Sequence, residues 1–231
     1  MQENREIFWK KKRKLPGIKD QQSDPDKYRY VEDQKNEKEG FRVAVVPITY
    51  YKSTKLERAL ERLFVEVDKA YKDGADILVL SDRDVDENHM AIPSLLAVSA
   101  VHQHLVATKK QTSLSLILES GEPREVHHFA TLLGYGACAV NPYLALDTIH
   151  ELIEEEMLDK DYYAAVEDYT LAILHGIVKI SSKMGISTIQ SYQGAKIFEA
   201  IGISKEVTDK YLRRYSQPCG RYHHGGYREA R

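Results

Sequence analysis

The chain alternates between short apolar runs and longer segments in which apolar residues recur every three or four positions. The first run, 41–48 (FRVAVVPI), is rich in valine, which is typical of a strand buried on both faces of a parallel sheet. Over 54–73, leucine, valine and alanine recur at helical spacing opposite a charged side, which predicts an amphipathic helix. Gly74 favours the end of that helix, and 77–80 (ILVL) predicts a second buried strand.

The same cycle of strand and helix continues along the chain. Gly136 and Gly185, like Gly74, each stand between a predicted helix and a predicted strand, and this recurrence supports a repeated architecture. Each unit takes about 30 residues, as expected of βαβ crossovers. The remaining predicted elements are strands at 113–118, 138–140 and 185–189 and helices at 92–108, 124–133, 143–157, 162–183 and 193–200.

These elements predict an α/β fold of repeated βα units with a mainly parallel sheet, arranged as a partial or open barrel-like structure. About five strands are predicted, whereas a closed βα barrel needs eight. The helix at 92–108 is apolar on nearly all sides until His102 and His104. We therefore expect this helix to lie deep against the sheet or against another domain.

Charge and composition divide the chain into four parts. Half of residues 1–40 are charged, and few apolar residues recur there, so we expect a mobile N-terminal tail. Its basic run at 10–14 (KKKRK) is best interpreted as a solvated charge run, with binding of a polyanion or a targeting role as the alternatives. The other expected parts are a βα-repeat domain at 41–161, a helix and strand–helix segment at 162–212, and a divergent polar tail at 213–231.

Composition excludes several classes of function. The formal net charge of -2 provides no overall field to attract nucleic acid or an anionic membrane. No apolar run approaches the ~18 residues that a membrane span needs, so we expect a soluble, cytoplasmic protein with no membrane partner. The two cysteines, Cys138 and Cys219, cannot form a disulfide framework, a cysteine zinc site or an iron–sulfur cluster within this chain.

Polar residues follow the predicted strands, where parallel sheets collect their ligands because helix N-termini point there. Asp82 and Arg83, together with Glu122 and Arg124, either bind an acidic substrate or hold two loops together. The second reading is favoured, because buried loop ends often use such pairs. The loops concerned are 81–83, 119–124, 141–142 and 190–192.

The sequence gives little support for metal binding or for nucleophilic catalysis. His127 and His128 are adjacent in a predicted helix and face about 100 degrees apart, so they cannot easily share a metal ion, and no metal site is expected. Cys138 falls in an apolar strand, where we expect a buried, inert thiol. The sequence contains no GxGxxG, Walker A or GxSxG pattern. No catalytic residue is therefore predicted.

The segment 182–199 (SKMGISTIQSYQGAKIFE) gathers hydroxyl and amide side chains around a predicted strand end that leads into a helix. Donors of this kind can hold a phosphate or a carboxylate. From composition alone, an ordinary polar turn is an equally good interpretation.

Four segments closely resemble a known family, the large (alpha) subunit of glutamate synthase. The similarity covers about 41–212 and corresponds to the later part of that enzyme's central domain and its passage into the FMN-binding domain. The matching segments are LVLSDR (78–83), IPSLLAVSAVHQHLV (92–106), LESGEPREVHHFATLLGYGACAVNPYLA (118–145) and SKMGISTIQSYQGAKIFEAIGIS (182–204).

The resemblance implies a component of an enzyme that makes L-glutamate from L-glutamine and 2-oxoglutarate. In that family an amidotransferase domain releases ammonia, which travels through a tunnel to 2-oxoglutarate. Reduced FMN then delivers a hydride to the resulting imine, and an iron–sulfur cluster relays electrons. The central domain joins the two sites and helps to form the tunnel, so the implied partners are the remaining glutamate synthase domains or chains.

The resemblance also implies which residues border the FMN and 2-oxoglutarate site. Gln190 is the expected substrate contact, because its amide can donate to a carboxylate. The residues expected to contribute to cofactor binding are Ser182, Lys183, Met184, Gly185, Ser187, Thr188 and Ser191.

The sequence also departs from the family. It has no amidotransferase domain, no set of cluster cysteines and no glycine-rich barrel end to surround the FMN phosphate. We therefore expect a split or truncated gene product, or a segment, that is not catalytic alone. The alternatives are a non-catalytic small-molecule-binding or scaffold module and an inactive remnant. The electron donor, whether ferredoxin, NADH or NADPH, stays open.

Overall fold

The computed structural model of the chain describes residues 41–212. The chain divides into two units, Met1–Phe41 and Arg42–Arg231, and the second holds nearly all of the described residues. The predicted tails at 1–40 and 213–231, and with them the basic run at 10–14, lie outside the described residues.

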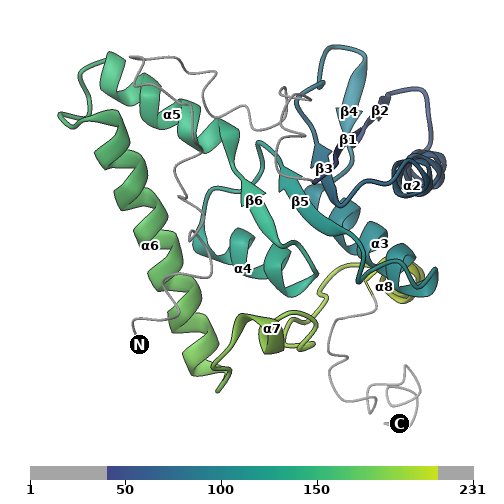
Figure 1. Ribbon diagram of the computed structural model, residues 1–231. Coiled ribbons are helices and arrows are strands. Elements are labelled where there is room, and N and C mark those ends of the chain that lie inside the picture. The colour runs from purple at the N-terminus through teal and green to yellow at the C-terminus, as the bar shows by residue number, and fades with distance from the viewer. Residues whose placement is uncertain (1–40, 213–231) are drawn as a thin grey trace, which may run out of the picture. The chain divides into compact units, whose positions relative to one another are not determined.

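A parallel four-stranded sheet forms the centre of the second unit (Figure 1). Its strands are β1 (Val43–Pro47), β3 (Ile77–Ser81), β5 (Ser115–Glu119) and β6 (Ala139–Asn141), and they lie in the order β1-β3-β5-β6. Ser81 pairs with Glu119, which pairs with Asn141, so the last residues of three strands are neighbours. The predicted α/β class with a mainly parallel sheet is confirmed.

Three helices connect these strands: α2 (Leu56–Lys72), α3 (Ser94–Ala107) and α4 (Val126–Gly134). The strand order never reverses along the sequence, so right-handed crossovers place all three helices on the same face of the sheet. Alternate strand residues face these helices and form the core, among them Val46, Leu78, Leu80, Leu116 and Leu118. The result is an open, singly wound sheet without barrel closure.

The helix predicted at 92–108 is confirmed as α3, and it is buried as expected. Its apolar side chains pack against the sheet and α2, and its first buried residue, Ser94, begins the helix after Pro93. A short helix, α8 (Lys205–Tyr211), covers another side of α3. Ser99 donates from its hydroxyl to the backbone oxygen of Tyr211 at 2.6 Å, which fixes that contact.

An antiparallel ribbon, which the sequence did not predict, stands beside the ends of the first two parallel strands. It pairs β2 (Thr49–Tyr51) with β4 (His89–Ala91). Each strand has three residues, too few for an alternating pattern to show, and their partners lie about 40 residues apart. Only the tertiary pairing identifies these strands.

Two further helices form a hairpin after β6: α5 (Tyr143–Glu154) and α6 (Tyr162–Lys183). α6 packs against α4 and α5. Gly176 makes the contact with α4 possible, because an added Cβ there would lie 2.5 Å from both methyl groups of Val126. Tyr169 donates from its hydroxyl to the backbone oxygen of Arg124 at 3.0 Å, on the same side of α6.

The predicted strand at 185–189 and helix at 193–200 are wrong. The structure has a four-residue helix, α7 (Ile189–Tyr192), followed by irregular backbone. Tyr192 is fully buried, Gln193 donates from its side chain to the backbone oxygen of Ala137, and Gly194 donates from its backbone to Gly134. These long-range contacts hold the segment against the turn before β6 and not beside the sheet as a fifth strand.

Cys138 is also placed differently from the prediction, because its side chain is exposed. It directly precedes β6, which lies at the edge of the sheet and has only β5 as a strand neighbour. The apolar surroundings in sequence therefore did not imply burial. A strand at a sheet edge lacks a neighbour on one side.

Candidate functional site

Polar side chains meet at the carboxyl end of the sheet, where parallel strands deliver their last residues to one edge. The register Ser81–Glu119–Asn141 places three of them side by side, and the residues that follow each strand add the others. We name this group the strand-end network: Ser81, Asp82, Arg83, Glu119, Ser120, Gly121, Asn141 and Tyr143.

Glu119 is the centre of the network and is only 1% exposed. Ser81 donates from its hydroxyl to one carboxylate oxygen at 2.8 Å. Arg83 Nε donates to the other oxygen at 2.8 Å, and Asn141 Nδ2 donates to the same oxygen at 3.2 Å. A buried carboxylate is tolerable only when it is paired and hydrogen-bonded, and Glu119 meets both conditions.

Asp82 forms a second centre and is also buried. Ser120 donates from its hydroxyl to Asp82 Oδ2 at 2.5 Å, and the backbone N–H of Gly121 lies 3.2 Å from both carboxylate oxygens. Burial, followed by the charge of Asp82 and a hydrogen bond to it, raises the pKa of Tyr143. The phenol therefore stays neutral and can donate to the carboxylate.

Arg83 joins the two centres. Its guanidinium lies 4.2 Å from the centroid of the Tyr143 ring, in cation–π geometry, while its Nε pairs with Glu119. Glu122 accepts hydrogen bonds from the backbone and hydroxyl of Ser94 at 3.0 and 2.5 Å, and its backbone N–H donates to the hydroxyl of Ser120 at 3.2 Å. The favoured interpretation, that charged residues hold these loops together, fits this geometry, but the four residues named from sequence do not pair with one another: Arg83 pairs with Glu119, and Asp82 accepts from Ser120 and Gly121.

The histidines have structural contacts. Nδ1 of His128 accepts from the backbone of Glu125 in a capping box at the start of α4. His104 hydrogen-bonds Asp68 at 3.0 Å and stacks on Phe64. His102 is buried close to Gly136. Within residues 41–212, no group of three or more histidine, cysteine, aspartate or glutamate side chains could hold a metal ion.

The residues predicted for cofactor and substrate contacts lie elsewhere. They run from the end of α6 to α7, and every one of the eight, including Gln190, is exposed. Thr188 and Ser191 share a hydrogen bond of 2.9 Å between their hydroxyls. Because the neighbouring segment bonds to the backbone of Gly134 and Ala137, it lies at the start of β6, whereas the strand-end network lies at its end (Figure 1).

The structure therefore brings together the residues of three predicted loops but leaves 182–191 at the opposite end of the sheet. Tyr143 was missed as a member of the network. Its position directly after Pro142, at the opening of a helix that follows a strand, was the available signal. The role predicted for 182–191 stays a prediction.

An open, mainly parallel sheet with helices between its strands defines an α/β domain of repeated βα units. Comparison with known proteins then specifies it: the glutamate synthase central domain matches residues 18–204, and the chain belongs to that family.

Several much longer proteins are similar to this chain. It is 54% identical over 160 residues to the "Glutamate synthase [NADPH] large chain" of Bacillus subtilis, covering 69% of this chain and 10% of that protein. It is 44% identical over 175 residues to "Glutamate synthase [NADH]" of Schizosaccharomyces pombe, covering 74% and 8%. A "Ferredoxin-dependent glutamate synthase 2" of Synechocystis is 42% identical over 168 residues, covering 67% and 11%. The chain thus spans about a tenth of these relatives.

Of the helices between residues 41 and 212, none is both long and apolar enough to cross a membrane.

Proposed function

We propose that the chain is a structural component of glutamate synthase that takes part in making L-glutamate from L-glutamine and 2-oxoglutarate. In this role it joins the ammonia-releasing and flavin-bearing parts and helps to form the tunnel between them, without being catalytic alone. The observation that carries the proposal is the family match over 18–204. The strand-end network supports a structural role, because its carboxylates are already occupied by donors from this chain.

The segment 182–191 is the proposed contribution to the flavin and 2-oxoglutarate site. Its hydroxyl side chains are exposed, and an added Cβ at Gly185 would meet nothing within 4 Å, so a phosphate or carboxylate could approach. Gln190 would donate to a substrate carboxylate. The residues fit the border of such a site, while FMN, which would supply hydride chemistry, needs the rest of the enzyme to surround it.

An iron–sulfur cluster does not fit this chain. Such clusters are held by four cysteine thiolates, and the sequence has only Cys138 and Cys219. In the proposed assembly the cluster and the FMN phosphate site belong to the other glutamate synthase domains, which are the partners of this chain. We propose that the chain acts in the cytoplasm. There it would take part in ammonia assimilation as a component of an oxidoreductase.

Reconstitution tests the proposal. The chain is expressed alone and together with the remaining glutamate synthase domains, and FMN retention and glutamine-dependent glutamate formation are measured. We expect both in the assembled sample and neither with the chain alone. Glutamate formation by the isolated chain would refute the proposal, as would an assembled sample that works equally well without it.

The second candidate is a non-catalytic module that binds 2-oxoglutarate or FMN, and the exposure of Gln190 favours testing it. Calorimetric titration of the isolated chain with 2-oxoglutarate would then show saturable binding that Gln190→Ala abolishes. Gln111→Ala is the matched control, because Gln111 is an exposed glutamine in the connection between α3 and β5. Equal binding by both variants would remove Gln190 from the site.

A further inference from the structure

Helix α6 packs one side against the domain and leaves the opposite side exposed. The packed side contains the buried residues Ala165 and Ile177, together with Gly176, which lies against Val126 of α4. In Figure 1, α6 forms an edge of the described residues, with α4 and α5 on one side of it. On its other side, five exposed positions recur at alternating spacings of three and four residues. We name this row the outer face of α6: Asp168, Leu171, His175, Val178 and Ser182.

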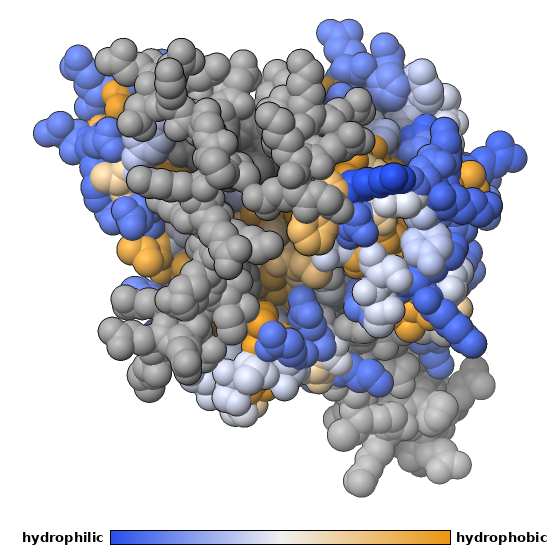
Figure 2. Space-filling model, in the orientation of Figure 1, coloured by the Kyte–Doolittle hydropathy of each residue, from blue (hydrophilic) through white to orange (hydrophobic). Residues whose placement is uncertain are grey.

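The middle of the outer face carries two large apolar side chains. Leu171 is 40% exposed and Val178 is 61% exposed, and they lie about two turns apart on the same side of the helix. Figure 2 shows hydrophobic patches between hydrophilic residues along the edge of the molecule that α6 forms. Ala172, next to Leu171, is small and exposed, so it leaves room for a second helix. Alternating spacings of three and four are those of side chains that pack between two helices.

The charged residues of α6 are separated by sign along the helix. The first half carries Glu167 and Asp168 and no basic residue. The second half carries Lys179 and Lys183 and no acidic residue. All four side chains are exposed. The helix dipole favours such an order only in the first and last turns, and of the four only Lys183 lies in one of them. The other three positions therefore need another explanation.

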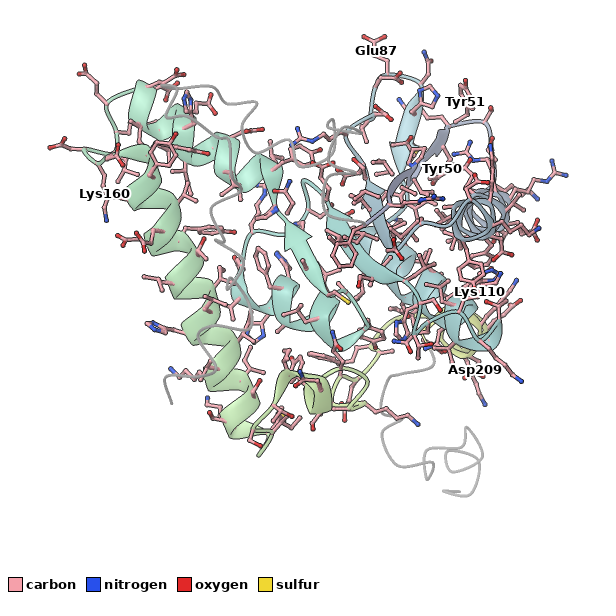
Figure 3. The ribbon with its side chains drawn as sticks, viewed as in Figure 1. Tyr50, Tyr51, Glu87, Lys110, Lys160 and Asp209 are labelled. Atoms are coloured by element: carbon pink, nitrogen blue, oxygen red, sulfur yellow. The ribbon has the colours of Figure 1, made fainter. Side chains whose placement is uncertain are left out.

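Most of these charges have no ion-pair partner within the domain. Asp168 pairs with Lys160, which projects from the turn before α6 (Figure 3). Within residues 41–212, none of the ion pairs involves Glu167, Lys179 or Lys183. These three exposed charges, one acidic and two basic, are therefore available to another surface.

We propose that the outer face of α6 is the interface of a homodimer, in which the α6 helices of two copies of this chain pack antiparallel. Leu171 of each copy then lies near Val178 of the other, on either side of a two-fold axis close to His175. The acidic half of each helix lies beside the basic half of the other. The same patch serves both copies, as the interface of a two-fold dimer requires.

Charge complementarity selects a second copy as the occupant. Both signs of charge lie on one helix in opposite halves, so the helix is complementary to itself when it is reversed. A parallel pair would place like charges together, and a partner surface of one sign would be repelled by one half of α6. The inference goes beyond the proposed function and does not depend on it.

Charge reversal tests this pairing. One variant carries Glu167→Lys and Asp168→Lys, and a second carries Lys179→Glu and Lys183→Glu. In each of them the whole helix has one sign of charge, so two copies should repel one another. A combined variant carries all four substitutions. Its net charge equals that of the natural chain, and its two halves are again opposite in sign, so antiparallel pairing should return.

Matched controls make the same changes of charge on α2. One carries Glu57→Lys and Glu61→Lys, and the other carries Lys69→Glu and Lys72→Glu, all at exposed positions. Sedimentation velocity of the full chain over a range of concentrations, at low and high salt, measures self-association. Thermal melts followed by circular dichroism check that each variant folds.

We expect the natural chain to form a dimer that salt weakens, because salt screens the attraction between the two halves. Each reversed α6 variant should dimerise at least about tenfold more weakly, the combined variant should recover to within about threefold, and the α2 controls should stay within about twofold. A natural chain that stays monomeric, or α6 variants that dimerise as well as the α2 controls, would refute the interface.

Two further outcomes would overturn the choice of occupant or orientation. If the combined variant does not recover, the antiparallel pairing of two copies is wrong. If the natural chain does not self-associate, but both α6 variants weaken its binding to the remaining glutamate synthase domains, those domains and not a second copy cover the outer face. In either case the proposed function is unaffected, because it does not require a dimer of this chain.

Discussion

Replacing Glu119 by glutamine should destabilise the domain, because three donors converge on one buried carboxylate. The substitution keeps the shape of the side chain but removes its negative charge. Arg83 then keeps a positive charge without its ion-pair partner, and one of the two acceptor oxygens becomes a donor that faces Ser81 or Asn141. The whole effect lies in electrostatics and hydrogen bonding, since the volume hardly changes.

The magnitude follows from how buried each partner is. Removing one member of a fully buried ion pair costs about 3–5 kcal/mol. The Glu119 side chain is 1% exposed but that of Arg83 is 33% exposed, so the guanidinium can recover part of its hydration. We therefore expect a loss of about 2–3 kcal/mol in the free energy of unfolding, below the range for a fully buried pair.

Urea unfolding of the full chain, followed by circular dichroism, measures this loss as a lower midpoint at an unchanged slope. Glu87→Gln is the control, because Glu87 is exposed on the loop between β3 and β4, and it should stay within about 0.5 kcal/mol of the natural chain. A Glu119→Gln protein as stable as this control would refute the network as a source of stability. Adding Arg83→Met should recover part of the loss, since the unpaired charge is then removed.

Two other perturbations address the packing and the surface charge. Gly136→Ala should lower the melting temperature strongly, because Gly136 has φ of +117° and an added Cβ would lie 2.3 Å from Nδ1 of His102. Gly185→Ala is the control and should lower it less, because Gly185 has φ of +70° and an added Cβ would meet nothing within 4 Å. Equal losses in the two variants would contradict the steric argument. Burial acts to raise the pKa of Asp68, but hydrogen bonds from Lys110 and a neighbouring histidine lower it overall. The stability that Asp68 contributes is thus present above its unfolded pKa near 3.8 and is lost as pH falls through the lower folded pKa. The difference in the free energy of unfolding between the natural chain and Asp68→Asn should therefore shrink from pH 6 to pH 3, as urea titrations at each pH will measure.

The strand-end network could be anticipated only in part. Parallel strands must end at one edge, so the loops at 81–83, 119–124 and 141–142 were expected to gather polar residues, and they do. The bonding within the network depends on the strand register, which periodicity does not specify. The Ser81–Glu119–Asn141 row therefore had to come from the structure.

The segment after α6 shows most clearly what the local sequence could not predict. A short apolar run after Gly185 satisfies the local requirements of a strand, yet a strand also needs a neighbour with free backbone groups. The structure instead buries Tyr192 and bonds Gly194 to Gly134, and the segment ends as one turn of helix and irregular backbone. The prediction that Cys138 is buried was wrong for a similar reason, because exposure at a sheet edge depends on strand order, which local sequence does not specify.

By itself, the sequence determined the α/β class, the four parallel strands, and helices α2 to α6, because short apolar runs and the helical period of 3.6 residues are local properties of the chain. It also carried the family resemblance, which residues 18–204 confirm. Only the tertiary structure determined the β2–β4 ribbon, the backbone conformation of 185–200 and the hydrogen-bond partners of Glu119. These depend on contacts between residues distant in sequence, whose free energy no local pattern contains.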